Sequence, residues 1–330
     1  EEFTVTITVN PKPIVAAQEI EVCSGEELGI DFNASSTIAV ASYEINEILI
    51  DGSTNITGIN TITGFSVGSG TPRQGVGLSA DEISDDSFIN TTGASVEVVY
   101  TVVPYDAIGC NGDAFTVTVT VNPQPAVADQ IATPVSSRAA LGVTTLGSDT
   151  NGLVFSKYRI VDINNNGLTA GSNNKVVTDV ISENGILNDT YINKTSVTVN
   201  VIYSIVPISE DGCEGDSFTV TVAINPEPVV DPQTLTVCSD EAIDVSLNPS
   251  SSVAVANYTL INTNANGLTE VDPTASATIT NDILSAGGYS NNSNDPVDVV
   301  YTIVPVSAQG VDGEEFTLTV SVNPAPKVAD

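Results

Sequence analysis

The chain has 330 residues, and its 41 acidic residues against 8 Lys and Arg give a formal net charge of −33. A surface of that sign repels nucleic acid and anionic lipid, so both are excluded as partners, and no apolar run predicts membrane insertion. The sequence contains no His, which excludes catalysis by an imidazole base. Its hydrophobic content of 41% is mainly Val, Ile and Ala, as in a folded β-rich protein.

One pattern, FTVTVTVNPQP at Phe115–Pro125, organises the whole chain. Near copies of it occur at Phe3–Pro13, Phe218–Pro228 and Phe316–Pro326. Its strict alternation puts Phe and Val on one face of a strand and Thr on the other, so one face is predicted to be buried. The Asn-Pro-x-Pro that follows loses backbone donors at its prolines and favours an extended path. We therefore predict a stiff connector after each strand.

The spacing of this pattern sets the domain organisation. Its asparagines, Asn10, Asn122, Asn225 and Asn323, are 112, 103 and 98 residues apart. About 100 residues are enough for an autonomous sandwich core, which a short solenoid repeat cannot build alone. The prediction is the last strand and linker of a preceding repeat at 1–13, β-sandwich repeats at 14–125, 126–228 and 229–326, and the start of a following repeat at 327–330.

The first full repeat contains a succession of short strand patterns. The predicted strands are Ile14–Val22, Leu28–Phe32, Tyr43–Ile50, Leu78–Ile83, Ser95–Val103 and the strand from Phe115. The fifth is expected to stop at Pro104. With no helical periodicity, this pattern predicts an all-β fold of tandem immunoglobulin-like or PKD-like β-sandwich domains in an extended rod. Strands of ~10 residues at ~3.3 Å each would make three units span about 110 Å.

Each repeat carries a tyrosine four residues before a proline near the end of a strand. These tyrosines are Tyr100, Tyr203 and Tyr301. Two interpretations stay open, an anchor similar to the tyrosine corner of immunoglobulin domains or an ordinary core tyrosine. Both are structural.

The four cysteines favour disulfides, and with them a location outside the cytoplasm, because there is no His and no CxxC pair for a zinc site. Cys23 and Cys238 lie at the first turn of repeats one and three, whereas Cys110 and Cys213 lie in the last loop of repeats one and two. Pairing within repeats would join Cys23 to Cys110 and would leave Cys213 and Cys238 without partners.

Counting strands favours a different pairing. In a head-to-tail rod of seven-strand units, the first turn of one unit meets the last hairpin of the next. This rule pairs Cys23 with Cys213 between domains, places Val135 opposite Val311, and pairs Cys110 and Cys238 with units outside this sequence. Such a disulfide would brace a domain junction against bending and pulling. The pair within repeat one stays the alternative.

A calcium site is the second candidate. Asp162, Asn164 and Asn166 match the opening D-x-N-x-N-G of a calcium loop, but the twelfth residue is Asn173 and not the bidentate Glu. Such a site would be weak. The alternative is an Asn-Gly hairpin turn, which the third repeat repeats at Asn266-Gly267.

The run VVYTVVP…GCNGDAFTVTVTVNPQP, with EVCSGEE upstream of it, resembles the PKD-like repeats of giant cell-surface proteins of the Bacteroidota. Such repeats occur in adhesins exported by type IX secretion, among them the gliding-motility adhesin of flavobacteria. The resemblance implies an extracellular location at the bacterial cell surface and no catalytic activity.

These observations lead to a structural hypothesis: the chain is a stalk or fibre segment of a large extracellular adhesin that serves surface attachment or gliding motility. It is not expected to be an enzyme or to hold a cofactor other than calcium. Its expected partners are neighbouring repeats of the same chain, while polysaccharide or substratum would be contacted by other parts of the parent protein.

Two alternatives remain. One is a spacer in a secreted multidomain enzyme. The other is a polysaccharide-binding repeat that uses the loops Ser53–Gly77, Leu168–Val180 and Leu268–Ile283. Against the second, these loops contain a single aromatic residue, Phe65, whereas carbohydrate platforms usually display several.

Overall fold

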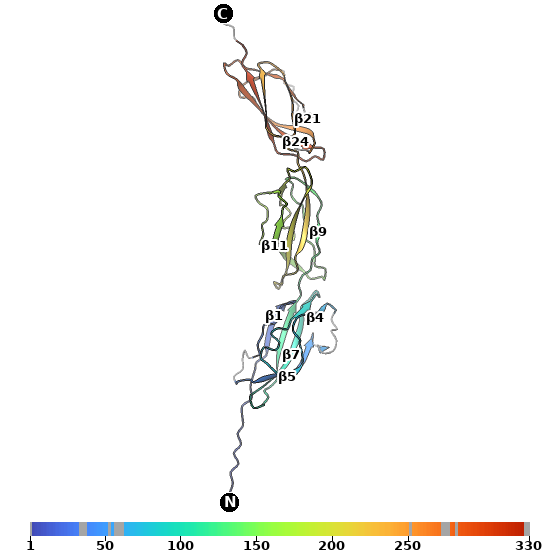
Figure 1. The fold of residues 1–330 in the computed structure, drawn as a ribbon, viewed down its shortest axis with the longest axis vertical. Coiled ribbons are helices and arrows are strands. Elements are labelled where there is room, and N and C mark those ends of the chain that lie inside the picture. The colour runs from blue at the N-terminus through green and yellow to red at the C-terminus, as the bar shows by residue number, and fades with distance from the viewer. Residues whose placement is uncertain are drawn as a thin grey trace.

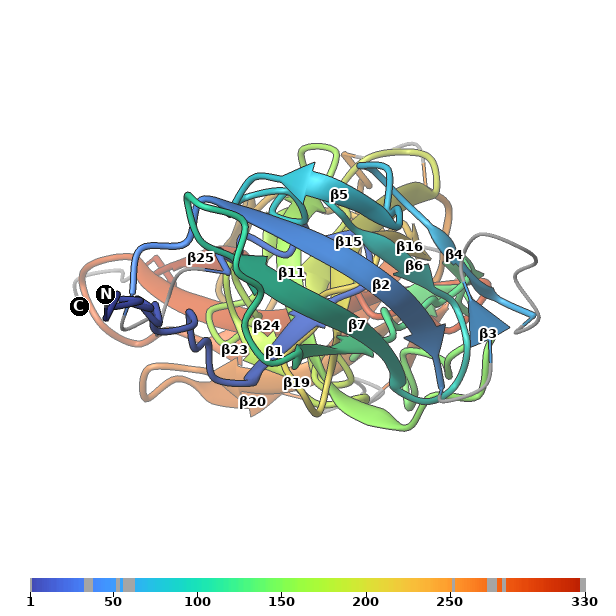
Figure 2. The ribbon, with the colours of Figure 1, turned by 90° about the horizontal axis from the view of Figure 1, so that it is seen from below.

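The computed structural model describes residues 2–32, 38–51, 54–55, 63–250, 253–271, 278–280 and 283–326. Its regular elements are all β-strands, gathered in three sandwich units that follow one another end to end as a rod (Figure 1). Seen along the rod, the units lie over one another (Figure 2). No helix in the described ranges is long and apolar enough to cross a membrane. The all-β prediction is confirmed.

Each unit has a core of its own. The buried hydrophobic clusters and the side chains packed on them lie within 15–121 (unit 1), 127–224 (unit 2) and 230–322 (unit 3). The repeated strand pattern supplies each core as predicted, because Phe115, Val117 and Val119 are buried while Thr116 is exposed. The predicted start of a following repeat at 327–330 lies outside the described residues.

Unit 1 is built on a sheet in the order β1-β8-β7-β2-β3, to which β5 adds by pairing with β2, and β4 and β6 form a separate ladder. The first strand runs parallel to the last, while β8, β7 and β2 are antiparallel. The strands are β1 (Gln18–Cys23), β2 (Ser42–Ile50), β3 (Thr54–Asn55), β4 (Phe65–Val67), β5 (Gly75–Leu78), β6 (Phe88–Asn90), β7 (Val96–Tyr105) and β8 (Phe115–Asn122).

Unit 2 repeats this sheet in the order β10-β16-β15-β11-β13, with β12 and β14 as the separate ladder. Its first strand is divided into β9 and β10, each of which pairs with β16 in parallel. The strands are β9 (Gln130–Ile131), β10 (Val135–Ser136), β11 (Phe155–Asn164), β12 (Thr169–Ala170), β13 (Val180–Ile181), β14 (Tyr191–Ile192), β15 (Val199–Ser209) and β16 (Phe218–Asn225).

Unit 3 has the order β17-β25-β24-β19-β21, with two further ladders, β18 with β22 and β20 with β23. Its first and last strands again run parallel. The strands are β17 (Gln233–Cys238), β18 (Ile243–Ser246), β19 (Val255–Asn264), β20 (Thr269–Val271), β21 (Thr278–Thr280), β22 (Ile283–Ala286), β23 (Gly288–Ser290), β24 (Val297–Ser307) and β25 (Phe316–Asn323).

The prediction that a strand stops at Pro104 is wrong, since β7 continues to Tyr105. Pro104 lies opposite Tyr43 in the ladder, and its carbonyl accepts a hydrogen bond from the Gly112 amide at 2.8 Å. The residue thus contributes through its acceptor, and its missing N–H does not end the strand. Strands β15 and β24 continue past Pro207 and Pro305 in the same way.

Two other predicted strands are placed differently. Residues Leu28–Phe32 form no strand, yet Leu28 and Phe32 are buried and their amides bond to the carbonyls of Asp86 and Ala80. The predicted strand Leu78–Ile83 is wrong as well, because β5 ends at Leu78 and a turn follows. The apolar pattern therefore identified the buried side chains correctly, but their backbone lies in loops and turns instead of the predicted strands.

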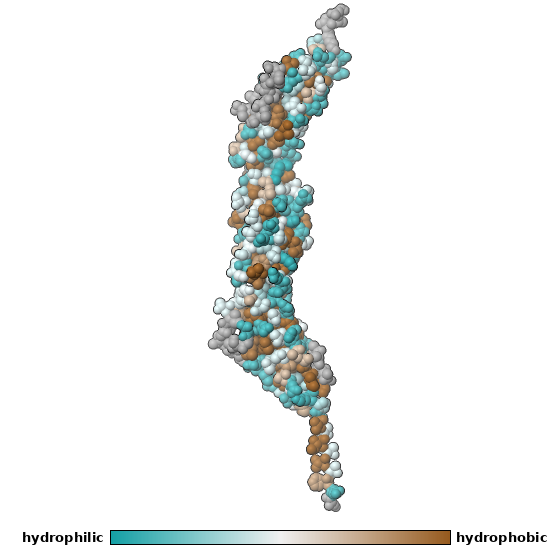
Figure 3. All heavy atoms as spheres, turned by 180° about the vertical axis from the view of Figure 1, so that it is seen from behind, coloured by the Kyte–Doolittle hydropathy of each residue, from teal (hydrophilic) through white to brown (hydrophobic). Residues whose placement is uncertain are grey.

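The first copy of the repeated pattern lies outside any sheet of this chain. Residues 2–17 form no strand, and Phe3, Val5, Ile7 and Val9 are 87%, 68%, 80% and 86% exposed. Figure 3 shows this segment as an apolar run below unit 1, whereas apolar and polar atoms are mixed over the units. Its assignment to a preceding repeat stays a prediction.

The three repeated tyrosines are fully buried core residues with side-chain partners. Tyr100 donates to Asp86 at 2.8 Å and Tyr203 to Asp189 at 2.7 Å, whereas Tyr301 donates to the Tyr289 hydroxyl at 3.4 Å. These partners support the core interpretation, because a tyrosine corner bonds back to the main chain. Burial raises the pKa of Asp86 to about 6, against the hydrogen bond from Tyr100, which lowers it.

This buried carboxyl makes unit 1 sensitive to pH. The native state holds the Asp86 proton up to about pH 6, whereas the usual pKa of this side chain is 3.8, so stability is lost as the pH rises through this window. Asp86→Asn is expected to remove this loss of stability and to stabilise unit 1 at pH 7 relative to the parent chain.

Hydrogen exchange of the β8 amides at pH 5 and pH 7, corrected for intrinsic rates, measures this effect. Unit 3 is the internal control, because Gly287 is buried two residues before Tyr289, as Asp86 precedes Phe88. An Asp86→Asn chain whose β8 protection still falls between the two pH values would contradict the assignment.

Candidate functional site: the junctions between units

The last hairpin of each unit packs directly on the linker that enters that unit. A Cβ atom on Gly215 would lie 1.8 Å from the carbonyl oxygen of Pro125, and one on Gly112 would lie 2.1 Å from that of Pro13. Gly313 and Pro228 repeat this approach. Only glycine fits here, because any side chain would displace the linker. The linker is therefore held by the unit that it enters.

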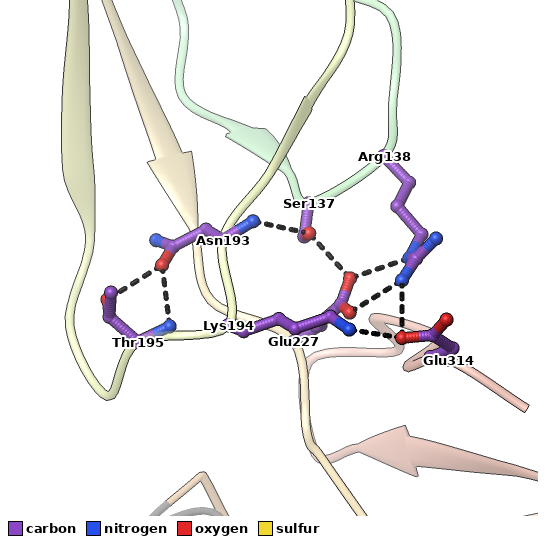
Figure 4. A network of polar contacts seen from close by, with 7 residues as sticks. All are labelled: Ser137, Arg138, Asn193, Lys194, Thr195, Glu227 and Glu314. Carbon is purple, nitrogen blue, oxygen red and sulfur yellow. Dashed lines mark hydrogen bonds and ion pairs between the residues drawn. The ribbon is translucent and has the colours of Figure 1, made fainter. Parts of the chain in front are cut away.

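A buried asparagine holds the linker between units 2 and 3 at the end where it leaves unit 2. Asn193, fully buried, donates from Nδ2 to the carbonyls of Val197 and Ile224 at 2.9 and 2.7 Å, and its Oδ1 accepts from the amide and hydroxyl of Thr195 (Figure 4). Its own carbonyl accepts the linker amide of Glu227 at 2.9 Å. Asn90 and Asn291 make the same side-chain bonds in units 1 and 3.

Sequence reasoning missed this asparagine latch. The signal is an Asn-x-Thr or Asn-x-Ser triplet that lies at the same distance before each Asn-Pro linker: Asn90, Asn193 and Asn291 precede Asn122, Asn225 and Asn323 by 32 residues each. Such triplets also occur by chance in so Asn- and Thr-rich a chain, so the triplet alone does not mark a buried site. The buried Nδ2 atoms, bonded to two carbonyls each, explain why the triplet recurs.

Replacing Asn193 should lower the stability of unit 2. Asn193→Ala removes the side-chain donor of the buried Ile224 carbonyl, at a cost of about 1–3 kcal/mol, so we expect unit 2 to lose about that much unfolding free energy. Denaturant titration followed by exchange of the unit 2 amides measures the loss. The exposed Asn173 provides the control variant Asn173→Ala, and equal effects of both variants would refute the latch.

The junction between units 1 and 2 is covalent. Cys23 at the end of β1 and Cys213 in the β15–β16 hairpin form a disulfide with their Cα atoms 5.5 Å apart. This is the inter-domain pair that the strand count favoured, and it leaves Cys110 of the alternative pair as a thiol. Cys213 is fully buried. The bond joins residues separated by 190 positions, so most of both units lies inside one closed loop.

The junction between units 2 and 3 is held by charges (Figure 4). Glu227 of the linker is fully buried, and its carboxylate accepts two hydrogen bonds from Arg138, at 2.8 and 2.9 Å, and one from Ser137 at 2.6 Å. Arg138 and Lys194 of unit 2 both pair with Glu314 of unit 3. These hydrogen bonds raise the pKa of Arg138 and lower that of Glu314.

The two junctions occupy equivalent places in the repeat. Cys23 is paired in register with Asn122, and the residue paired with Asn225 in unit 2 is Ser136. The expectation that Val135 holds this position is therefore wrong by one residue, since the divided first strand of unit 2 shifts the count. In the hairpin, Val311 takes the place of Cys213, because Ser307 bonds to it as Ser209 bonds to Cys213. Ser136 and Val311 thus replace the disulfide.

The predicted calcium residues lie at a hairpin turn. Asp162 is an exposed residue of β11 beside a register shift, and Asn164 ends that strand. The amide oxygen of Asn164 accepts the Asn166 N–H, and the Asn166 side chain donates to the Asn200 carbonyl. Asn166 and Gly167 both have positive φ, as an Asn-Gly hairpin turn requires. The turn therefore accounts for these residues, and calcium binding stays a prediction.

The remaining candidate residues lie apart. Within the described ranges, no group of three or more Cys, Asp or Glu could hold a metal ion. Of the three loops considered for polysaccharide, the first and third fall partly on residues outside the description, at 53, 56–62, 272–277 and 281–282. Phe65 is buried and stacks on Phe88 with ring centroids 5.7 Å apart, so it offers no exposed aromatic platform.

Known structures with a similar arrangement are distant. Three of them are Drosophila N-cadherin EC1-4 (11% identity, covering 93% of this chain and 74% of that one, TM-score 0.24), the sialic acid binding region of the Streptococcus sanguinis SK1 adhesin (13%, 96% and 79%, 0.25), and the Bacteroides ovatus mixed-linkage glucan protein SGBP-B (13%, 95% and 71%, 0.19). At these scores they carry no argument about function. Among curated proteins, no relative matches.

A family model identifies the units themselves. The model of the PKD-like domain matches residues 20–125, 144–228 and 235–326, which is one match for each sandwich unit and most of the chain. PKD-like domains together with a disulfide indicate an extracellular protein. The chain belongs to the PKD-like domain family, of which it contains three tandem copies.

Proposed function

We propose that the three PKD-like units form a tension-bearing spacer in a large extracellular adhesin at a bacterial cell surface, where they serve attachment or gliding. The observation that carries the proposal is the Cys23–Cys213 bond across a domain junction. A binding module depends on its binding loops and on the fold that holds them, but it does not require covalent bonds between successive units. A spacer under load does, because its junctions are where a rod bends.

The rest of the molecule supports the same role. Each linker is held by a hairpin glycine of the unit that it enters, and the linker between units 2 and 3 is also held by the carbonyl of buried Asn193, so the rod is stiff where flexible linkers are usual. The charge of −33 keeps neighbouring chains apart and soluble. In this proposal the chain has no catalytic role, and other parts of the parent protein bind the surface.

Three measurements test this function. Solution scattering of the purified chain should give an extended rod of at least about 110 Å with one narrow distribution of shapes. Antibodies against the chain should label intact cells of the bacterium that makes it. Titration against a panel of polysaccharides should show no saturable binding. A broad distribution of bent shapes would reject the spacer, while saturable binding lost on trimming loop 168–180 would favour an adhesive repeat.

A further inference from the structure

The backbone pairing and hydrogen bonds around Cys238 reproduce those around Cys23, which is one half of the Cys23–Cys213 disulfide. Each cysteine ends the first strand of its unit and is paired in register with the last asparagine of that unit, Asn323 or Asn122. The Cys238 amide donates to Glu241 at 2.9 Å, and the Cys23 amide donates to Glu26 at 3.2 Å. Cys238 is exposed and is not in a disulfide.

The approach to the two sites is also the same. Cys23 follows Pro13 by ten residues, and Cys238 follows Pro228 by ten. The residue after each cysteine donates its amide to the last asparagine's carbonyl, from Ser24 at 2.8 Å and from Ser239 at 3.0 Å. The linker therefore places both cysteines at the same end of their units with the same backbone geometry.

Cys110 lies in a site that reproduces the Cys213 half. Both cysteines lie in the last hairpin of their unit, where their carbonyls accept an amide four residues earlier, that of Asp106 at 3.0 Å or Ser209 at 2.9 Å. Their own amides return a bond to the side chains of those residues. Gly112 and Gly215 follow at the same spacing and press on the entering linker. Cys110 is half-buried and is not in a disulfide.

We infer that Cys110 and Cys238 are the two halves of further inter-unit disulfides: Cys110 bonds a cysteine at the Cys23 position of a PKD-like unit before unit 1, and Cys238 bonds one at the Cys213 position of a unit after unit 3. Between units 1 and 2 of this chain, both halves meet and are bonded. The pairing also deepens the proposed function, since it assigns the partner of each end of the rod.

The chemistry of each bond is that of the Cys23–Cys213 pair. One Sγ–Sγ bond forms while two S–H bonds break, and the two protons and two electrons pass to a protein disulfide donor, which becomes a dithiol. With both bonds formed, the junctions before unit 1, between units 1 and 2, and after unit 3 are covalent. The junction between units 2 and 3 has Ser136 and Val311 at the cysteine positions. It is then held by ion pairs, whereas the three other junctions are covalent.

A tandem chain tests the inference. Residues 2–326 are followed directly by a second copy of residues 14–326, so that Pro326 enters the second copy as Pro13 enters the first. Its central junction then places Cys238 of the first copy against Cys110 of the second. After expression with a disulfide donor, alkylation and non-reducing digestion, we expect a Cys238–Cys110 peptide beside the two Cys23–Cys213 peptides.

The two native bonds are the folding control within the same molecule. Chains in which both Cys23–Cys213 bonds are closed while Cys238 and the second Cys110 are alkylated, or are bonded between molecules, would overturn the inference. The Cys238→Ser tandem should leave the second Cys110 open to alkylation. The scattering test of the spacer uses the three-unit chain, in which Cys110 and Cys238 are far apart and cannot pair. A failed tandem experiment therefore leaves the spacer proposal untouched, and a failed scattering test does not decide the pairing.

Discussion

Pulled by its two ends with the Cys23–Cys213 bond closed, the chain is expected to extend without releasing the residues between these cysteines. Tension passes from the N-terminus to Cys23, across the bond and on from Cys213, so the loop between them is bypassed. The bond spans 190 positions, which at ~3.5 Å per residue withholds about 660 Å of chain. Reduction should return this length.

The bypass follows the rod. Strand β1 ends at Cys23, and β16 begins shortly after Cys213 and ends at the linker to unit 3. Both strands run along the length of their units (Figure 1). The covalent path therefore goes up β1, through the disulfide and up β16, and neither strand has to leave its sheet for the load to be carried. This path is a consequence of topology, because the first and last strands of each unit are parallel.

Of the two units that the bond shields, unit 2 has the weaker pairing between its first and last strands. Pulling a unit by its ends shears its parallel first and last strands, and their hydrogen bonds resist together. Units 1 and 3 have six consecutive residue pairs there, β1 with β8 and β17 with β25. Unit 2 has two pairs in β9 and two in β10, separated at Pro134, which cannot donate to the ladder. We infer that unit 2 yields first once the bond is reduced.

Single-molecule force spectroscopy separates these cases. The oxidised chain should show one large release, from unit 3, while the reduced chain should show three, with unit 2 at the lowest force. The Cys23→Ser/Cys213→Ser variant should behave as the reduced chain, and the matched Cys238→Ser variant should behave as the oxidised one. Three full-length releases from a chain whose Cys23–Cys213 bond is verified would refute the bypass.

Much of this organisation could be predicted from the sequence because it repeats. The alternation at Phe115–Pro125 fixed the last strand of every unit, and the positions of Cys23 and Cys213 in the repeat were enough to favour a bond between units. Both are local patterns that need no knowledge of the packing. The strand that runs through Pro104 was missed, since only its partners show that the proline acts through its carbonyl.

The charged junction could not be predicted in the same way. Arg138, Lys194, Glu227 and Glu314 come from four separate segments, and their spacing carries no periodic signal. The asparagine latch was missed for another reason: its triplet is short and common, and burial alone distinguishes it. The structure thus adds what depends on long-range approach, while the sequence already contained what depends on repetition.

The disulfide should be transferable to the junction that lacks it. Ser136→Cys/Val311→Cys puts thiols at the positions of Cys23 and Cys213, as the β10–β16 register and the hairpin bonds define them. We expect this pair to close in most molecules under the conditions that close the native bond.

Val135→Cys/Val311→Cys is the matched control. Successive residues of a strand point to opposite faces, and Val135 packs against the unit 2 core, so this pair is expected to stay reduced. Peptide mapping reads both outcomes, and closure of the control pair in preference to the Ser136 pair would show that the junctions are not equivalent. In the closed variant, Arg138→Ala should no longer loosen the rod. In the parent chain, Arg138→Ala leaves Glu227 buried without its cation, which should lower the stability of the junction by about 3–5 kcal/mol. Scattering should register this loss as bending between units 2 and 3.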